Sequence, residues 1–435
     1  MKKAFLFISI LFTLTIIMIS CSSDDDEGRS GFTFITQEPK TAYIGGTIDL
    51  ELDVNAAKLY DLYLYIGEKP IPASNISIER SYVDYCAIKV RIPNLWMHFA
   101  NEIVTYRNSD NKILATGPMV SSIKTYRFFG SVARGGMINA KLSSVEGTNK
   151  VVTLTEREPF AKKKHFIEFK GYTASGTLDI ELSWQDLAFP LINGRAPSSL
   201  VGELSPSGFS TRDNITYMGM YYSSAGTSYV VQEYGGVLRV SGEGMHTQLG
   251  HLNIADIEQD RNNIMFIRTL QTPNCIYKMS ELNAPVIWVG SATESRTIDG
   301  DLLNARFEDV VSIDRDSDDN LYVAQKTVVR KITPHGEVTT LDKFRFEDIS
   351  AIAIGPDNRI YVIDREQPSV LNVIDTQQSN LYSFPIRDGF SDNTIDNLYN
   401  SCNIAVSNDG IVYIGSYTMG YDHIYHILVP DDWNQ

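Results

Sequence analysis

Two copies of one charged tetrapeptide are the residues of this chain best suited to polar chemistry. The sequence Arg-Phe-Glu-Asp occurs at residues 306–309 and again at 345–348, so the two starts are 39 residues apart. A guanidinium beside two carboxylates can make bidentate, charge-assisted hydrogen bonds to a ligand that carries hydroxyl groups. Tyrosines brought to the same place could pack against the apolar face of a ring.

A run of alternate aspartates is a second chemical signal. Asp314, Asp316 and Asp318 have the oxygen spacing of a calcium-binding loop. The EF-hand form of that loop also needs a glycine and a glutamate where this chain has Asp319 and Gln325. Aspartate is common in turns because its side chain bonds to nearby backbone. We therefore expect a hairpin turn here and no metal.

Motifs of catalysis are weak or missing from the sequence. His423 and His426 lie in a strand pattern, where residues three apart point to opposite faces, so we interpret them as structural. There is no Gly-x-Ser-x-Gly nucleophile elbow and no Gly-rich phosphate loop. We expect no catalytic residue, no cofactor and no enzymatic activity.

Each tetrapeptide begins a unit of a longer repeat. An apolar stretch, a polar turn and a second apolar stretch with an aromatic residue follow it, at 310–324 and 349–364. Weaker copies of this pattern occur at 406–414, 254–267, 215–231 and, in degenerate form, 138–182. A period of roughly 40 residues with hairpin-length strands is typical of a β-propeller blade, and a blade must stack on neighbours to bury both faces.

These units predict an all-β chain with little helix that ends in a β-propeller over residues 125–435. Six blades is the favoured number, and seven is the alternative because residues 186–213 could hold one more degenerate blade. The last unit, at 406–428, shows only about three strands. We expect the fourth to come from residues 126–132, which would close the ring.

One unit, residues 298–341, resembles a repeat of the NHL propeller family. Asp299-Gly300, Ala305-Arg306-Phe307 and Arg330-Lys331-Ile332-Thr333 stand where that pattern places them. There are two departures. The usual Pro-x-Gly is missing after Phe307, and the usual aspartate after the Tyr-Val-Ala strand is Gln325, although Asp364 keeps it in the next unit. The resemblance implies a propeller that binds proteins or peptides, while some six-bladed propellers hold a divalent ion in the channel.

Propeller geometry gathers the candidate site residues on one face. The loops that enter the inner strands and the loops between second and third strands surround the same mouth of the central channel. The candidate ligand-binding residues at that mouth are Arg306, Glu308, Asp309, Arg345, Glu347, Asp348, Tyr234, Arg268, Arg365, Tyr417 and Tyr421. The competing interpretation is that the charges pair between blades and the tyrosines pack between sheets.

The N-terminus predicts export. Lys2 and Lys3 precede an apolar run at 4–19 that is too short for a stable spanning helix. A basic start followed by a short apolar run is typical of a signal peptide, here residues 1–20.

A lipid anchor is predicted directly after this segment. The small or apolar residues before Cys21 resemble a bacterial lipobox, so Cys21 is the expected lipidation site. Residues 21–31 would then form a tether, and its acidic run at 24–27 resembles a surface-export signal of lipoproteins in one Gram-negative phylum. A merely solvated tether is the alternative interpretation of the acidic run. The expected location is the outer membrane, facing the cell exterior.

Residues 32–124 predict a separate β-sandwich. Residues 48–54 alternate polar and apolar, and short strands follow at 62–66, 87–92 and 102–106. Gly45-Gly46 and Val90-Arg91-Ile92-Pro93 resemble the IPT/TIG class of Ig-like domains. The resemblance implies a stalk that holds the propeller away from the membrane.

Composition limits the partners. The formal net charge of −15 disfavours nucleic acid and anionic membrane faces, so the lipid anchor is the only membrane contact expected. Cys86, Cys275 and Cys402 lie in apolar, strand-like contexts without CxxC spacing. We expect buried free thiols rather than a disulfide framework or a metal site.

Three functional classes fit these observations. The first is a surface lipoprotein that binds a carbohydrate, or another hydroxyl-rich ligand, in polysaccharide capture for an outer-membrane transporter. The second is a protein-interaction scaffold. The third is a metal-dependent hydrolase or lactonase, whose possible metal ligands are Glu308, Asp309, Glu347, Asp348 and Asn403. The fold does not choose between the three, but the weakness of catalytic motifs favours the first two.

Overall fold

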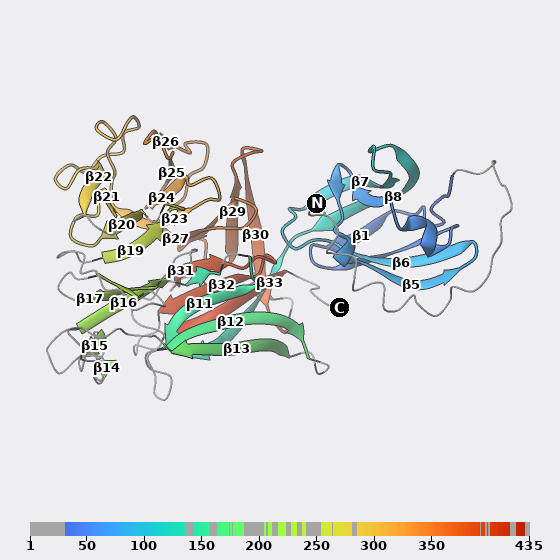
Figure 1. The fold of residues 1–435 in the computed structure, drawn as a ribbon, viewed down its shortest axis with the longest axis horizontal. Helices are drawn as coiled ribbons and strands as arrows, with labels where there is room; N and C mark the ends of the chain where they lie inside the picture. The colour runs from blue at the N-terminus through green and yellow to red at the C-terminus, as the bar shows by residue number, and fades with distance from the viewer. Residues whose placement is uncertain are drawn as a thin grey trace.

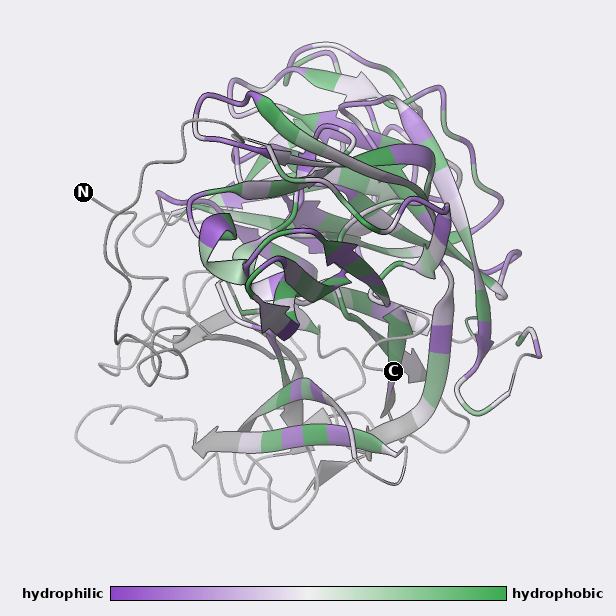
Figure 2. Ribbon diagram, turned by 90° about the vertical axis from the view of Figure 1, so that its right-hand side faces the viewer, coloured by the Kyte–Doolittle hydropathy of each residue, from purple (hydrophilic) through white to green (hydrophobic). Residues whose placement is uncertain are grey.

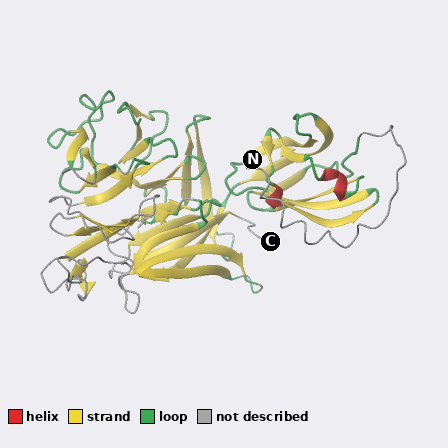
Figure 3. Ribbon diagram, viewed as in Figure 1, coloured by secondary structure: helices red, strands yellow, loops and turns green. Residues whose placement is uncertain are grey.

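The structure is a computed structural model that is almost entirely β in the residues it describes (Figure 1). These residues are 31–134, 142–145, 147–155, 163–173, 175, 177–186, 204–205, 208–210, 216–222, 228–232, 237–240, 254–262, 264–280, 285–391, 393–395, 398, 401–417 and 423–430. Their only helices are the short 3-10 turns η1 (Ala56–Leu59) and η2 (Ala73–Asn75), both in the N-terminal part (Figure 3). Within these ranges no helix has the length and apolar character needed to cross a membrane.

A β-sandwich forms the N-terminal part. One sheet has the order β1 (Lys40–Tyr43), β8 (Ile113–Ile123), β7 (Phe99–Arg107), β3 (Tyr63–Ile66) and β4 (Lys69–Pro70). The other has the order β2 (Thr47–Leu52), β6 (Tyr85–Arg91) and β5 (Ile76–Tyr82). The alternation of β2 places Ile48, Leu50 and Leu52 in the shared core and Asp49 outside. Figure 2 shows this alternation of polar and apolar residues along single strands.

The rest of the described chain forms a β-propeller, which confirms the predicted fold class. The first two sheets contain β10 (Ser143–Ser144), β11 (Lys150–Thr155), β12 (Lys163–Tyr172) and β13 (Leu178–Asp186), and then β14 (Leu204–Ser205), β15 (Gly208–Ser210), β16 (Thr216–Tyr222), β17 (Ser228–Gln232) and β18 (Val237–Val240). The next two contain β19 (Ile254–Gln259), β20 (Met265–Thr269), β21 (Cys275–Met279) and β22 (Val286–Gly290), and then β23 (Val310–Arg315), β24 (Leu321–Gln325), β25 (Val329–Ile332) and β26 (Val338–Thr340). The last two groups of strands are β27 (Ile349–Ile354), β28 (Ile360–Asp364), β29 (Val370–Asp375) and β30 (Asn380–Asp388), and then β31 (Ser401–Val406), β32 (Val412–Tyr417), β33 (His423–Pro430) and β9 (Tyr126–Arg134).

The number of blades stays a prediction. Most of residues 186–213, on which the seven-bladed alternative depends, lie outside the described residues.

The predicted closure of the ring is confirmed. β9 pairs antiparallel with β33, from Tyr126 opposite Pro430 to Arg134 opposite Ile424. Its first residues also pair in parallel with the end of β30. A strand that follows directly after the sandwich therefore supplies the outer strand of the last blade.

The internal repeat has a structural counterpart in the inner strands. β19, β23, β27 and β31 each have a bulge at the same position, next to Asp256, Ser312, Ala351 and Asn403. The aromatic residues that mark the period are buried between blades: Tyr322 packs with Ile352 of the next blade, and the Tyr413 hydroxyl accepts a hydrogen bond from the Phe169 amide at 2.9 Å. These tyrosines thus serve packing between sheets.

The sandwich docks on the propeller through the segment 94–98. Asn94 Nδ2 donates to the Asp409 carbonyl at 3.0 Å, and Arg359 Nη1 donates to the Leu95 carbonyl at 3.2 Å. Met97 is buried in the core shared by the last two blades. Because Asp409 and Arg359 lie in the turns after inner strands, the sandwich sits on the side of the ring where those strands end.

Buried thiols are found where the structure describes them. Cys86 and Cys275 are free and buried, as predicted. The side chain of Cys402 lies outside the described part.

Candidate functional site

At two blade junctions that the structure describes, the loop entering an inner strand lies beside the second-to-third loop of the previous blade. The amide of Val310, at the start of β23, donates to Pro273 O of the previous blade at 2.8 Å. In the next blade, the Ile349 amide donates to Lys326 O at 2.7 Å in the same way. These hydrogen bonds pair backbone groups of neighbouring blades, and we call the surface formed by these loops the entry-loop face.

The first tetrapeptide is occupied by its own loop. Phe307 is fully buried, and Arg306 Nε lies 3.1 Å from Glu294 Oε2 while its Nη1 donates to Leu303 O at 2.7 Å. Glu308 and Asp309 are exposed, and the Asp309 amide donates to Asn274 Oδ1 at 2.9 Å. Of this copy, the two carboxylates therefore face solvent, whereas the guanidinium is engaged.

The second tetrapeptide leaves its arginine available. Arg345 and Glu347 are exposed, and neither side chain has a hydrogen bond or ion pair to the described residues. Asp348 Oδ2 lies 3.2 Å from Arg365 Nη1 of the same blade. The structure thus brings Asp348 and Arg365 together, and neither tetrapeptide makes an ion pair between blades in the described part.

Among the remaining candidates, Arg268 has the only side chain that the structure describes. Arg268 is half-buried and donates to Val310 O at 3.2 Å and to Ala255 O at 3.4 Å, so it bonds strand backbones together. Tyr234, Tyr421 and the side chain of Tyr417 lie outside the described residues.

A buried arginine that the sequence analysis did not select holds the first tetrapeptide in place. Arg330 is fully buried, lies 4.4 Å from the Phe307 ring and donates to Asp299 Oδ1 at 2.8 Å and to Ile298 O at 2.6 Å. Burial raises the pKa of Asp299, but its hydrogen bonds from Thr340 and Arg330 outweigh this and leave that pKa below its usual value. Both residues belong to the quoted NHL-like pattern, which was the available signal.

In two neighbouring blades, a polar side chain at the end of the second strand supports the loop that enters the inner strand. Asp364 is fully buried and accepts hydrogen bonds from the Glu347 and Asp348 amides, both at 3.0 Å. Gln325 occupies the equivalent place and donates instead to Glu308 O at 2.8 Å. The departure at Gln325 therefore exchanges an acceptor for a donor and keeps the support of the loop.

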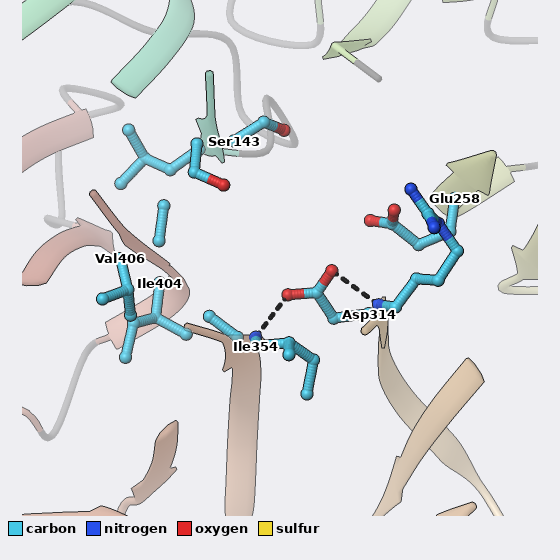
Figure 4. A pocket seen from close by; sticks show the side chains of 11 residues that line it. Ser143, Glu258, Asp314, Ile354, Ile404 and Val406 are labelled. Carbon is cyan, nitrogen blue, oxygen red and sulfur yellow. Dashed lines mark hydrogen bonds between the residues drawn. The ribbon is translucent and has the colours of Figure 1, made fainter. Parts of the chain in front are cut away.

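A small cavity lies at the other end of the inner strands (Figure 4). Its volume is about 70 Å³, and Glu258, Asp314 and Ser143 are among its polar lining residues. The Asp314 carboxylate accepts from the Ile354 amide at 2.6 Å and from the Arg315 amide at 2.8 Å. A cavity of this size holds a few water molecules, whereas small-molecule pockets are typically ~300 Å³ or larger.

The alternate aspartates form a turn, as predicted. Asp316 Oδ1 accepts from the amides of Asp318 and Asn320, both at 2.9 Å. Across the described part of the chain, no three His, Cys, Asp or Glu side chains are grouped so that they could hold a metal ion. Glu308, Asp309, Glu347 and Asp348 accordingly stand as separate exposed or ion-paired groups.

Comparisons with known proteins gave similarities of structure only. No protein-family model matches the sequence, and no curated protein matches it. A solved Bacteroides thetaiotaomicron protein of unknown function is 12% identical, with a TM-score of 0.49, over 94% of this chain and 100% of that one. An auxiliary nutrient binding protein from the same organism is 14% identical, with a TM-score of 0.33, over 77% and 96%. A gluconolactonase from Xanthomonas campestris is 12% identical, with a TM-score of 0.36, over 70% and 89%.

Proposed function

We propose that this chain is a lipid-anchored outer-membrane protein whose NHL-like propeller captures a carbohydrate, or another hydroxyl-rich ligand, for uptake at the cell surface. Cys21 carries the lipid, residues 21–31 are the tether, and the IPT/TIG-like sandwich is the stalk. An outer-membrane transporter is the expected partner, and the proposal includes no catalytic step.

The observation that carries the proposal is the exposed charge on loops whose backbones are hydrogen-bonded. Arg345 and Glu347 stand free on loops whose backbones are bonded to Asp364, and Glu308 is exposed on the equivalent loop of the neighbouring blade. Neither the Arg345 nor the Glu347 side chain has to break a bond to a described residue before it binds a hydroxyl, and hydrogen bonds to charged groups are stronger than those between neutral groups. The sandwich contacts the opposite side of the ring and leaves the entry-loop face open.

A glycan array followed by binding isotherms tests the proposal. Arg345→Ala should weaken the binding of a captured glycan by roughly tenfold or more, the loss expected for a hydrogen bond to a charged group. Arg80→Ala, an exposed arginine on the sandwich, is the matched control and should bind as the unchanged protein does. Equal affinity in both variants would place the ligand site elsewhere.

One observation favours a protein partner as the second candidate. Leu303 is 83% exposed on the loop before the first tetrapeptide, and the Asp301 carboxylate accepts its amide hydrogen bond at 3.0 Å. An exposed leucine on an ordered loop suits a protein surface better than a sugar. Leu303→Ser would then reduce transporter capture while leaving glycan affinity unchanged.

A further inference from the structure

The β5–β6 hairpin ends in the most exposed apolar tip of the sandwich. Val83 is 90% exposed in the two-residue turn between Tyr82 and Tyr85, and Tyr82 is 62% exposed. Tyr60, which is 57% exposed, follows the helix η1 that packs beside this hairpin. We define Tyr60, Tyr82 and Val83 as the hairpin tip.

The hairpin tip is rigid although it projects into solvent. Asn55 Nδ2 donates to Tyr82 O at 2.6 Å, and the Ala56 amide donates to Ser81 Oγ at 3.1 Å. The Tyr82 and Tyr85 rings lie 5.9 Å apart. The exposed side chain of Val83 is hydrated unfavourably, and no contact within the described chain removes it from water.

The chain enters the sandwich at the same end as the tip. Phe34 pairs with Leu52, Leu52 with Cys86, and Cys86 with Ser81, so these residues form one row across the sandwich. Thr33 Oγ1 donates to Asp53 Oδ2 at 2.9 Å beside that row. The propeller docks at the opposite end, where Thr47 pairs with Arg91, roughly 20 Å along β6 from Tyr85.

The length of the tether allows the tip to reach a lipid surface. Ten residues separate Cys21 from Gly31, and even fully extended they span at most ~36 Å. Tyrosine is favoured at the boundary between lipid and water, where its ring is buried and its hydroxyl stays wet. Resting on the proposed lipid anchor at Cys21, we propose that Tyr60, Tyr82 and Val83 dock into the interface of the membrane that holds the anchor.

This docking would orient the sandwich relative to the membrane. With its tip on the lipid, β6 points away from the membrane and the propeller is held at the far end (Figure 1). Near the tip, Lys58 and Arg80 stand against Asp53, Asp61 and Asp84, a net charge of −1, so apolar insertion and not charge would drive the contact.

Site-specific fluorescence on the full lipidated protein tests this inference. Val83→Trp is compared with Leu303→Trp, an 83% exposed position on the propeller, in phosphatidylcholine vesicles with and without brominated acyl chains. The signal of the protein with its own four tryptophans is subtracted. We expect the added tryptophan at 83 to shift to shorter wavelength and lose emission with brominated lipid, and the one at 303 to do neither.

Vesicle flotation separates the two premises. If the unchanged protein floats and its Cys21→Ser variant does not, the anchor is correct. If the tryptophan at residue 83 then shows the same emission as the one at residue 303, the docking of the tip is wrong while the anchor stands. If the unchanged protein does not float, the anchor fails and the docking inference falls with it.

Discussion

At the scale of single residues, the two arginines of the repeated tetrapeptide have different surroundings. Arg306 is bonded to Glu294 and to carbonyls of its own loop, whereas the Arg345 side chain has no partner in the described part of the chain. The tetrapeptide repeat alone does not reveal Arg330, the buried arginine beneath the first copy. Identical tetrapeptides can therefore differ in role because residues outside them decide which groups remain available.

Arg330 should contribute more to stability than any arginine of the tetrapeptides. Arg330→Ala removes hydrogen bonds to Asp299 and Ile298 O and leaves a cavity beside Phe307. We expect the free energy of unfolding to fall by about 2–3 kcal/mol, as for the loss of buried hydrogen bonds to a charged group. The exposed Arg345→Ala should change it by less than ~0.5 kcal/mol. Urea unfolding of both variants checks this, and equal midpoints would contradict it.

Lys124 should make stability depend on pH. It is fully buried at the junction, where Nζ donates to Asn94 O at 2.7 Å and to Trp96 O at 3.1 Å. Burial lowers the pKa of Lys124 to about 7, with a smaller opposing effect of Asp357. The unfolded lysine titrates near ~10.4, so between pH 7 and 9 the unfolded state binds one more proton and stability rises with pH.

The slope of unfolding free energy against pH identifies the contribution of Lys124. Stability should rise by up to ~1.4 kcal/mol per pH unit between pH 7 and 9, and Lys124→Met should lose this part of the slope. Below pH 7 both states are protonated and the contribution should be flat. Denaturant unfolding at several pH values measures it, and identical slopes in the two proteins would show that Lys124 is charged in the folded state.

At the scale of strands and turns, equivalent tyrosines in neighbouring blades offer a matched pair. The Tyr413 hydroxyl accepts from the Phe169 amide, whereas the buried Tyr361 hydroxyl has no hydrogen-bond partner among the described residues. Tyr413→Phe should cost about 1–2 kcal/mol because it leaves a buried amide without an acceptor. Tyr361→Phe should be neutral or stabilising, since it removes a hydroxyl that is buried without a partner. A larger loss for Tyr361→Phe, measured by thermal or urea unfolding, would refute this assignment.

The strands were largely predictable, and their supports were not. Hydrophobic spacing predicted the blades, and an incomplete last unit predicted that residues 126–132 would close the ring, because strand pairing follows from a simple period. The docking of 94–98 depends on Asp409 and Arg359, hundreds of residues away, and no local pattern encodes such contacts. The support of the entry loops by Asp364 and Gln325 was equally hidden, since it becomes visible only when strand ends and loops are placed in space.

At the scale of the whole molecule, one strand connects the two parts. β9 follows the sandwich after Lys124 and Thr125, and it pairs with both β30 and β33. The junction is therefore covalent, hydrogen-bonded and packed at once, which fixes the propeller relative to the sandwich. On the proposed docking of the hairpin tip, the entry-loop face would lie at a set distance from the membrane.

Removing β33 should unfold the propeller and spare the sandwich. A chain that ends at residue 422 leaves β9 and β32 without their shared neighbour, so the last blade cannot form. The sandwich has its own core, from Phe34 to Val120, and should persist as a protease-resistant fragment. A chain that ends at Pro430 is the control and should resist protease throughout. Full resistance of the shorter chain would show that closure through β33 is dispensable.

The pairing of β9 with β33 also governs how the protein can be made. Tyr126 emerges from the ribosome roughly 300 residues before its partner Pro430, so β9 exists for most of synthesis without its neighbour. During that interval its nine-residue edge, with Phe128 and Phe129 uncovered, can pair with any other extended chain. Production of this protein should consequently depend on factors that shield nascent chains, and shortage of those factors should yield aggregates that contain the propeller segment.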